Sequence, residues 1–262
     1  MVRLLVAIKG DIGVISLKTL VTTLENELRV LADLDRALSR EAQGSLDWVV
    51  SGVAEGSIEI EVESRPRIED KDVGREVVVQ LVRTLEDLET GRGTPPFLSE
   101  RGIKATRGMI GVIGRDGAVG LAVSTPGLQT VDVTPSAIIH GRQLTKVRDK
   151  AIGSVEGRLE AISIHGSYKL TVYQSINNRA VTCRLDRDRW PEDVGSLLGA
   201  RVNISGLVYY NAFGDPFRVD VEEVRRLRSR SDLPRVSDLT GMDPDFTGGL
   251  STEQYIKRFR VG

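Results

Sequence analysis

The sequence predicts an α+β protein in which an N-terminal antiparallel sheet with covering helices is followed by a five-stranded β-barrel and a short C-terminal helical tail. Three observations support this fold class. In residues 1–150, two long segments carry apolar residues at helical spacing, and shorter segments around them alternate as strands do. In residues 151–230, alternating segments are joined by turn signals and one short helical signal. In residues 231–262, Pro, Gly and Asp are frequent and periodic apolar residues are few.

Composition limits the possible classes of protein. The chain has 262 residues, 40% of them hydrophobic, which is enough for one or two buried cores, and the length favours two domains. The formal net charge of −1 argues against a generally basic nucleic-acid binder. The apolar run at the start is too short for a signal peptide or a membrane span, so we expect no membrane association. A single cysteine, Cys183, excludes an internal disulfide and indicates a reducing, cytoplasmic location.

Two long helices are expected in the N-terminal part. Ser16 is a good N-cap for the first helix, whose leucines recur on one face as far as Leu38. The second helix begins near Asp70 or Asp72 and ends at Gly91. Between the two helices, alternating residues predict a hairpin with one wet face, on which alternate glutamates are solvated surface residues.

The rest of the N-terminal part is predicted to contain a short helix, a second hairpin and a further helix. The short helix starts after Ser99, which is suited to an N-cap. The hairpin pairs Met109–Ile113 with Ala118–Val123 across an Asp-Gly turn. The further helix opens at Thr134 and reaches towards Lys150. With the first hairpin, these segments predict a mainly antiparallel sheet covered by helices.

The segment from Gly153 to Leu227 has the element order strand, strand, strand, short helix, strand, strand. Its first strand is expected from Ser154 to His165, with Gly157 as a point of bending. Asn177-Asn178 marks a tight turn between the second and third strands, and Trp190-Pro191 marks the start of the helix. This order of elements resembles that of the OB-fold, a five-stranded barrel.

The resemblance to OB-fold domains implies a binding face. Such domains commonly bind single-stranded nucleic acid or oligosaccharide on the second and third strands. The binding site extends between a first loop, which joins strands 1 and 2, and a second loop, which joins strands 4 and 5. Aromatic planes among cations suit base stacking and phosphate contacts. The alternative is structural, because tyrosines on a barrel are often half-buried and mixed charges often only solvate a surface. The predicted nucleic-acid-binding residues are Tyr168, Lys169, Tyr173, Arg179 and Arg184 on the strands, and Tyr209, Tyr210 and Phe213 near the second loop.

No catalytic motif is present in the sequence: it contains no GxSxG, HExxH, P-loop or kinase-like series. Two acid pairs, Asp186 with Asp188 and Asp243 with Asp245, have the residue type for a hard cation, but each lies beside turn or cap positions where Asp forms local hydrogen bonds. One cysteine and two histidines do not favour a zinc site. We therefore expect a non-enzymatic binding protein with no catalytic residues, metal or cofactor.

The tail is predicted to dock on a protein surface. Ser251-Thr252-Glu253-Gln254 matches a capping box and precedes a helix of about ten residues, which is too short to be stable alone in water. Its apolar residues must therefore contact the chain's own body, a homo-oligomer mate or another protein. The predicted partner-binding residues are Tyr255, Ile256, Arg258, Phe259 and Arg260.

The linker rich in Gly, Asp and Pro, the capped helix and the basic run Lys257-Arg258-Phe259-Arg260 are similar to the C-terminal tails of antitoxins that neutralise PIN-domain ribonucleases. The resemblance implies that Arg258 or Arg260 enters an acidic, Mg²⁺-binding active site of a nuclease toxin. Two functions follow from the sequence. One is a binding protein whose barrel takes up single-stranded nucleic acid and whose tail docks on a protein. The other is an antitoxin-like neutraliser whose barrel is a scaffold or a DNA reader.

Overall fold

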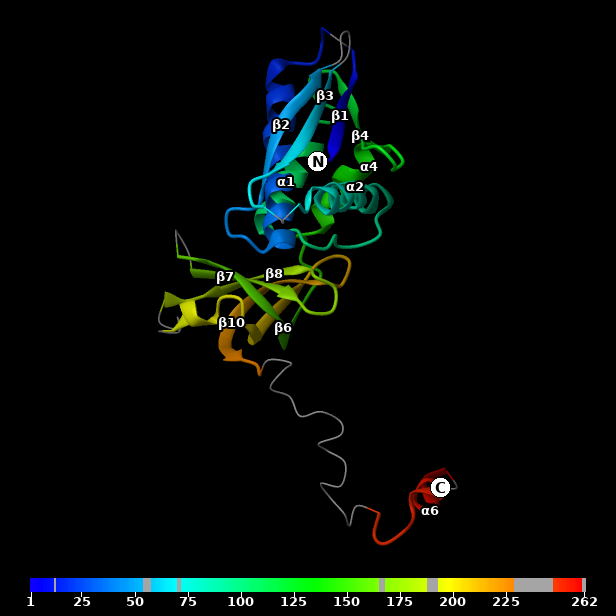
Figure 1. The fold of residues 1–262 in the computed structure, drawn as a ribbon, viewed down its shortest axis with the longest axis vertical. Coiled ribbons are helices and arrows are strands. Elements are labelled where there is room, and N and C mark those ends of the chain that lie inside the picture. Colours follow the sequence, from blue (N-terminus) through cyan, green and yellow to red (C-terminus); the bar gives the residue numbers. More distant parts are fainter. Residues whose placement is uncertain are drawn as a thin grey trace. The chain divides into compact units, whose positions relative to one another are not determined.

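The computed structural model divides the chain into two compact units, Met1–Leu227 and Arg228–Gly262. The first unit contains two five-stranded sheets, and helices accompany the N-terminal one (Figure 1). In the described part of the second unit, residues 247–260, one helix lies near the C-terminus. The structure describes residues 1–11, 13–53, 58–69, 72–164, 168–187, 193–228 and 247–260. Of Phe259 and Arg260 it describes only the backbone.

The N-terminal sheet consists of β1 (Arg3–Gly10), β2 (Leu46–Val53), β3 (Glu59–Pro66), β4 (Ala118–Ser124) and β5 (Val131–Val133). Its strand order is β2-β3-β1-β4-β5, and every neighbouring pair is antiparallel. The central strand, β1, alternates between the two faces of the sheet: Leu4, Val6 and Ile8 are buried, whereas Arg3 and Lys9 are exposed. The predicted antiparallel sheet is therefore confirmed, and one of its faces forms a core.

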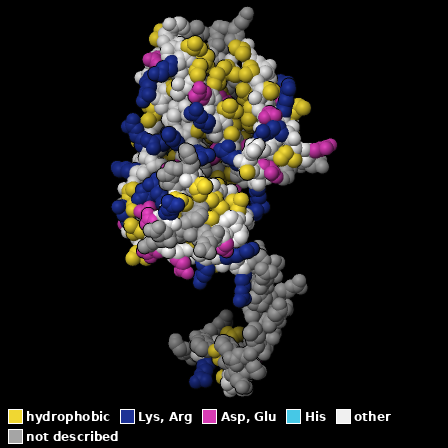
Figure 2. All heavy atoms as spheres, turned by 90° about the vertical axis from the view of Figure 1, so that its left-hand side faces the viewer, with side chains coloured by type: hydrophobic (Ala, Val, Ile, Leu, Met, Phe, Trp, Pro, Cys, Tyr) yellow, Lys and Arg dark blue, Asp and Glu magenta, His cyan; other side chains and the backbone are white. Residues whose placement is uncertain are grey.

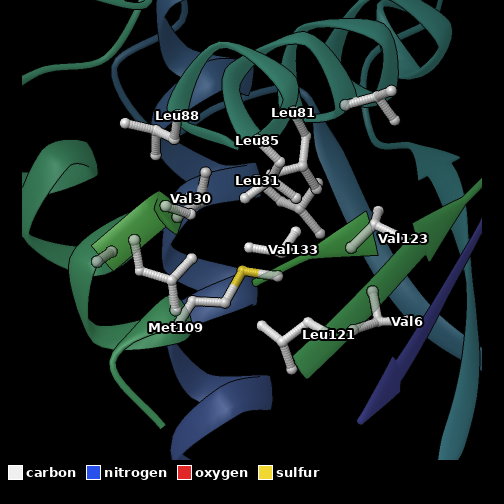
Figure 3. Close-up of a cluster of buried hydrophobic side chains, with 14 of the residues drawn as sticks. Val6, Val30, Leu31, Leu81, Leu85, Leu88, Met109, Leu121, Val123 and Val133 are labelled. Atoms are coloured by element: carbon white, nitrogen blue, oxygen red, sulfur yellow. The ribbon is translucent and has the colours of Figure 1, made fainter. Parts of the chain in front are cut away.

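Four helices accompany this sheet: α1 (Leu17–Ser39), α2 (Gly74–Thr90), α3 (Glu100–Ile110) and α4 (Pro135–Gln143). The predicted caps form, because the hydroxyl of Ser16 accepts a hydrogen bond from the Thr19 amide and Gly91 ends α2 in the left-handed conformation. The helices and strands share one apolar core, into which Leu31 of α1, Leu85 of α2 and Val6 of β1 project (Figure 3). None of the helices among the described residues is long and apolar enough to cross a membrane.

The other face of the sheet carries charged residues in pairs. Arg3 lies 3.8 Å from Glu61 and 3.5 Å from Glu63 of β3, and Lys9 lies 2.6 Å from Asp132 of β5. The hairpin of β2 and β3 was predicted, and its glutamates lie on the face opposite the core as expected.

The predicted hairpin between Met109–Ile113 and Ala118–Val123 is wrong in its first strand. Helix α3 continues to Ile110, and turns connect it to β4. Met109 and Ile110 are fully buried, and a short apolar run cannot distinguish a buried helix end from a buried strand. Asp116 and Gly117 do lie in a turn, closed by a 2.9 Å hydrogen bond from the Ala118 amide to the Arg115 carbonyl oxygen. The Asp116 carboxylate accepts hydrogen bonds from the hydroxyls of Ser16 and Thr19 at the start of α1.

The helix expected from Thr134 towards Lys150 is shorter than predicted. Thr134 caps α4, which ends at Gln143, and a strand begins at Asp149. Asp149 and Lys150 pair with Tyr210 and Tyr209 of another strand, so sheet pairing determines the conformation of these residues.

The second sheet consists of β6 (Asp149–Ser163), β7 (Tyr168–Gln174), β8 (Ala180–Leu185), β9 (Arg201–Tyr210) and β10 (Pro216–Arg226). The order β10-β8-β7-β6-β9 closes on itself because β9 pairs with both β6 and β10, and only the β8–β10 pair is parallel. A short 3-10 helix, η2 (Val194–Leu197), lies between β8 and β9. The expected helix start at Trp190-Pro191 lies outside the described residues.

The second sheet encloses its own core, separate from the first. Leu159, Leu170, Val181 and Cys183 are among its fully buried members. Gly157 of β6 is required by a close approach of the backbone, because a Cβ atom there would lie 2.1 Å from the carbonyl oxygen of Tyr173. The bulge of β6 follows it, between Leu159 and Ala161.

Glu27 is the most strongly perturbed acid of the N-terminal core. It lies on α1 with 3% of its surface exposed, and its Oε1 atom has no hydrogen-bond partner among the described residues. Burial raises the pKa of Glu27 from 4.5 to about 8. Between these two pH values the unfolded chain ionises this carboxyl and the folded chain does not, so its contribution lowers stability progressively as the pH rises through that window.

We predict that Glu27→Gln removes this pH dependence. The stability of the variant relative to the native chain should rise by about 1.4 kcal/mol per pH unit, on the order of 4 kcal/mol between pH 5 and pH 8. Urea unfolding at both pH values measures this difference, and any constant effect of the amide cancels. The control is Glu25→Gln, an exposed position on the same helix, which should leave the difference unchanged. Identical pH profiles for Glu27→Gln and the native chain would contradict the assignment.

Candidate functional site

The predicted nucleic-acid face of the barrel lies against the start of α3. Lys169 of β7 places its Nζ atom 3.1 Å from Glu100 Oε2, and Arg184 of β8 places Nη2 3.4 Å from Glu100 Oε1. One carboxylate from the N-terminal part of the chain therefore binds two of the predicted phosphate-contacting cations.

Helix α1 fixes the position of Glu100 through the cap of α3. Ser99 is the N-cap of α3, and its hydroxyl accepts hydrogen bonds from the amides of Arg101 and Gly102. Glu100 is therefore the first residue of the helix. Asp33 of α1 is 4% exposed and accepts hydrogen bonds from the Ser99 amide at 2.8 Å and the Ser99 hydroxyl at 2.7 Å. This buried carboxylate holds the N-terminus of α3 in place.

Arg179, immediately before β8, is the most extensively bonded of the predicted cations. Its Nε atom donates to the Thr94 carbonyl oxygen at 2.8 Å, and its Nη1 atom donates to the carboxylate of Asp215. The Arg179 and Asp215 side chains are 25% and 18% exposed, so this pair is shielded from solvent. A backbone hydrogen bond from the Phe97 amide to the Asn178 carbonyl, 2.8 Å long, joins the same two segments.

Tyr173 and Phe213 extend this contact. The Tyr173 hydroxyl lies 3.4 Å from the Phe97 carbonyl oxygen, and burial raises the pKa of Tyr173, so the phenol stays neutral as a donor. Phe213, from the loop between β9 and β10, packs against the N-terminal core. In the same loop, fully buried Asn211 donates to the Thr94 hydroxyl at 2.7 Å.

The remaining predicted tyrosines pack within the barrel. Tyr209 is 6% exposed, its hydroxyl donates to Asp220 at 2.6 Å, and the Arg218 guanidinium and Lys150 ammonium lie 3.5 and 4.9 Å from its ring centroid. Tyr168 and Tyr210 pack against the barrel core. All eight predicted residues therefore take part in contacts within the chain, five of them with the N-terminal part. Nucleic-acid binding by this face stays a prediction, and it requires these contacts to open.

The sequence prediction missed the residues that close this face. Thr94 and Phe97 lie between the helix predicted to end at Gly91 and the short helix predicted after Ser99, and Glu100 is the first residue of that short helix. Asp33 lies on a helix for which only the apolar face was considered. The one local signal was Glu100 in the first turn of a capped helix. No local pattern connects it with cations about 70 residues later in the chain.

Helix α6 (Thr252–Arg260) is the second candidate site, and it belongs to the C-terminal unit. The predicted capping box is present: the Gln254 side chain accepts from the Ser251 amide at 3.0 Å, and the Ser251 hydroxyl accepts from the Gln254 amide at 3.4 Å. Tyr255 is half-buried, Ile256 is 47% exposed and Arg258 is exposed. The side chains of Phe259 and Arg260 lie outside the described residues.

Metal-ligating side chains do not gather in the described part of the chain, where no three of His, Cys, Asp and Glu lie close enough to hold an ion. Asp186 is exposed, whereas Asp188, Asp243 and Asp245 are outside the described residues. Cys183 is enclosed in the barrel core, and burial raises the pKa of its thiol, which keeps it protonated.

Comparison with known proteins does not assign a family. No family model matches the sequence, and no curated protein matches it.

We predict that Arg179→Met loosens the contact between the barrel and the N-terminal part of the chain. The substitution keeps the aliphatic stem but leaves Asp215 and the Thr94 carbonyl without their donor, which should lower the free energy of unfolding by about 2–3 kcal/mol. The control is Arg201→Met, which removes an ion pair with Glu156 whose side chains are 41% and 42% exposed and should cost about 0–1 kcal/mol. Chemical unfolding of both variants provides the comparison, and equal losses would show that the Arg179 contacts are not part of a stable junction.

Proposed function

We propose that this is a non-enzymatic binding protein whose helix α6 docks on another protein. We further propose that residues 153–227 form an OB-fold that acts as a scaffold. The closed order of five strands with a short helix between the third and fourth supports the OB-fold assignment. The internal contacts of its strand face support the scaffold role.

Three features of helix α6 support docking on another protein. The helix has nine residues, a satisfied capping box and a place in a unit of its own. A helix of this length is marginal in water because few hydrogen bonds offset the cost of nucleation. The residues Tyr255 and Ile256 provide an apolar surface, and Lys257 and Arg258 provide adjacent positive charge. A partner with an apolar groove beside acidic residues fits this combination.

The barrel contacts favour protein docking over nucleic-acid binding. Lys169 and Arg184 are paired with Glu100, and Arg179 is bound to Asp215 and Thr94. A phosphate backbone would have to displace these acceptors before it reached the cations. The function of this face is therefore proposed to be the joining of two cores, with binding assigned to the tail.

Neutralisation of a nuclease toxin is the second candidate function. The observation that favours it is the exposed cation Arg258, which lies three residues after Tyr255 and two after Ile256 on the same helix. An arginine on a docked helix can form charge-assisted, bidentate bonds with carboxylates, which are among the stronger hydrogen bonds. The acidic active site of a PIN-type nuclease has this chemistry, as the resemblance of the tail implies.

We predict that a photo-cross-linking amino acid at position 256 captures a protein partner in cells. The matched control is the same amino acid at position 176, where the native isoleucine is 95% exposed on the first unit. The adduct should form at position 256 and not at 176, and Arg258→Glu should reduce its yield because it reverses the charge beside the apolar contact.

The identity of the adduct separates the two candidates. A nuclease with an acidic active site supports the antitoxin-like function, and any other protein supports a general docking role. A protein ending at Leu227 should keep its urea midpoint, since the first unit contains both cores. Equal cross-linking at the two positions, or a large loss of stability on truncation, would overturn the proposed role of the tail.

A further inference from the structure

The two edges of the N-terminal sheet differ in their protection. At one edge, β5 has three residues, a central Asp132 and a proline, Pro135, two positions beyond its end. At the other edge, β2 has eight residues, and Asp47 is its one charged residue. Exposed strand edges are usually shortened or carry Lys, Pro or several charges, because an unpaired strand is a template for pairing with another chain. The edge at β5 has such protection, whereas that of β2 is limited to Asp47 and a bulge between Val50 and Gly52.

Apolar side chains are exposed beside this edge. On β2, Val50 is 65% and Val53 is 71% exposed, and on α1, Leu17, Val21 and Leu28 are 75%, 45% and 52% exposed. We call these five residues the α1–β2 edge. Figure 2 faces the side on which α1 and β2 lie in Figure 1, and hydrophobic side chains gather over the N-terminal part of the molecule in this view. An apolar group of this kind on one flank is typical of an interaction site.

The exposed face of α1 lies on the same flank as β2. Leu28 and Asp35 are separated by two helical turns and therefore share one face of α1. Asp35 is 1% exposed because its carboxylate accepts hydrogen bonds from the Ser45 amide at 2.8 Å and the Leu46 amide at 2.9 Å, at the start of β2. The face that carries Leu28 is thus bound at one end to the start of β2, and it carries Leu17, Val21 and Leu28 as an exposed apolar stripe.

We propose that the α1–β2 edge binds a second copy of this chain, with the two β2 strands paired antiparallel. A strand paired antiparallel with its own copy is related to it by a two-fold axis, so one surface serves both partners. The bulge of β2 between Val50 and Gly52 leaves Leu46–Val50 as an uninterrupted run for this pairing. With Asp47 as the one charge of the strand, pairing brings few like charges together. The apolar stripes of the two α1 helices then cover the dimer interface.

Dimer formation would give the tail a second role. Two bodies joined at the α1–β2 edge carry two copies of α6, and a partner with two binding sites would meet the second helix at high effective concentration.

Sedimentation equilibrium of the full-length chain tests the proposal. We expect a concentration-dependent dimer. Val50→Lys and Leu28→Lys should each raise its dissociation constant at least tenfold, because each places a charge in the dimer interface. The matched control is Val119→Lys on β4, where the native valine is 66% exposed away from β2 in the strand order. It should leave the dimer intact. Circular dichroism and the unfolding midpoint confirm that each variant folds. A chain that stays monomeric throughout the concentration series, or a dimer unaffected by both lysines, overturns the proposal.

Hydrogen exchange tests the pairing itself. Outward-facing amides of Leu46–Val50 should exchange more slowly as the protein concentration rises, whereas those of Val131–Val133 at the opposite edge should not change. A dimer without this protection contradicts strand pairing. If the pure chain is monomeric and these amides are protected only when a different protein is added, then the second copy is not the occupant of this edge.

Discussion

The contact between the start of α3 and the β7–β8 face of the barrel is the interaction on which the first unit, Met1–Leu227, depends. Glu100 pairs with Lys169 and Arg184, and Arg179 is bound to the Thr94 carbonyl and to Asp215. The pairs of Glu100 are exposed and each contributes little. Stability at this junction comes from the whole set, in which the shielded Arg179 contacts and the buried Asn211 and Phe213 of the next loop exclude water. Together they join two separate cores into one compact unit.

This junction changes what the barrel can offer to a ligand. Five of the eight residues that resemble a nucleic-acid face contact the N-terminal part of the chain: Lys169, Tyr173, Arg179, Arg184 and Phe213. A surface that is already satisfied by hydrogen bonds and ion pairs gains little from a new ligand, because displaced groups need new partners. We therefore propose two other binding surfaces, namely the helix α6 of the C-terminal unit and the α1–β2 edge.

The sequence predicts elements well where local chemistry determines them. The alternating strands of the barrel, the Ser16 and Ser99 caps and the Ser251 capping box all form as expected. It fails where distant contacts decide: Met109 and Ile110 continue a helix because the core encloses them, and the strand at Asp149 forms because β9 pairs with it. The candidate site shows the same limit. Tyr173, Arg179 and Arg184 were identified from residue type, but their role depends on Glu100 and Phe97, which are far away in sequence.

The most direct measurement of the central claim is zero-length cross-linking with a carbodiimide, which joins a carboxylate to an amine only when they are in contact. The internal reference is Lys9 with Asp132, 2.6 Å apart within the N-terminal sheet. Lys169 and Glu100, 3.1 Å apart across the junction, should be linked in the same monomeric molecules, as identified by peptide mass. If the Lys9–Asp132 link forms and the Lys169–Glu100 link does not, the barrel face is open in solution and its assignment as an internal junction is contradicted.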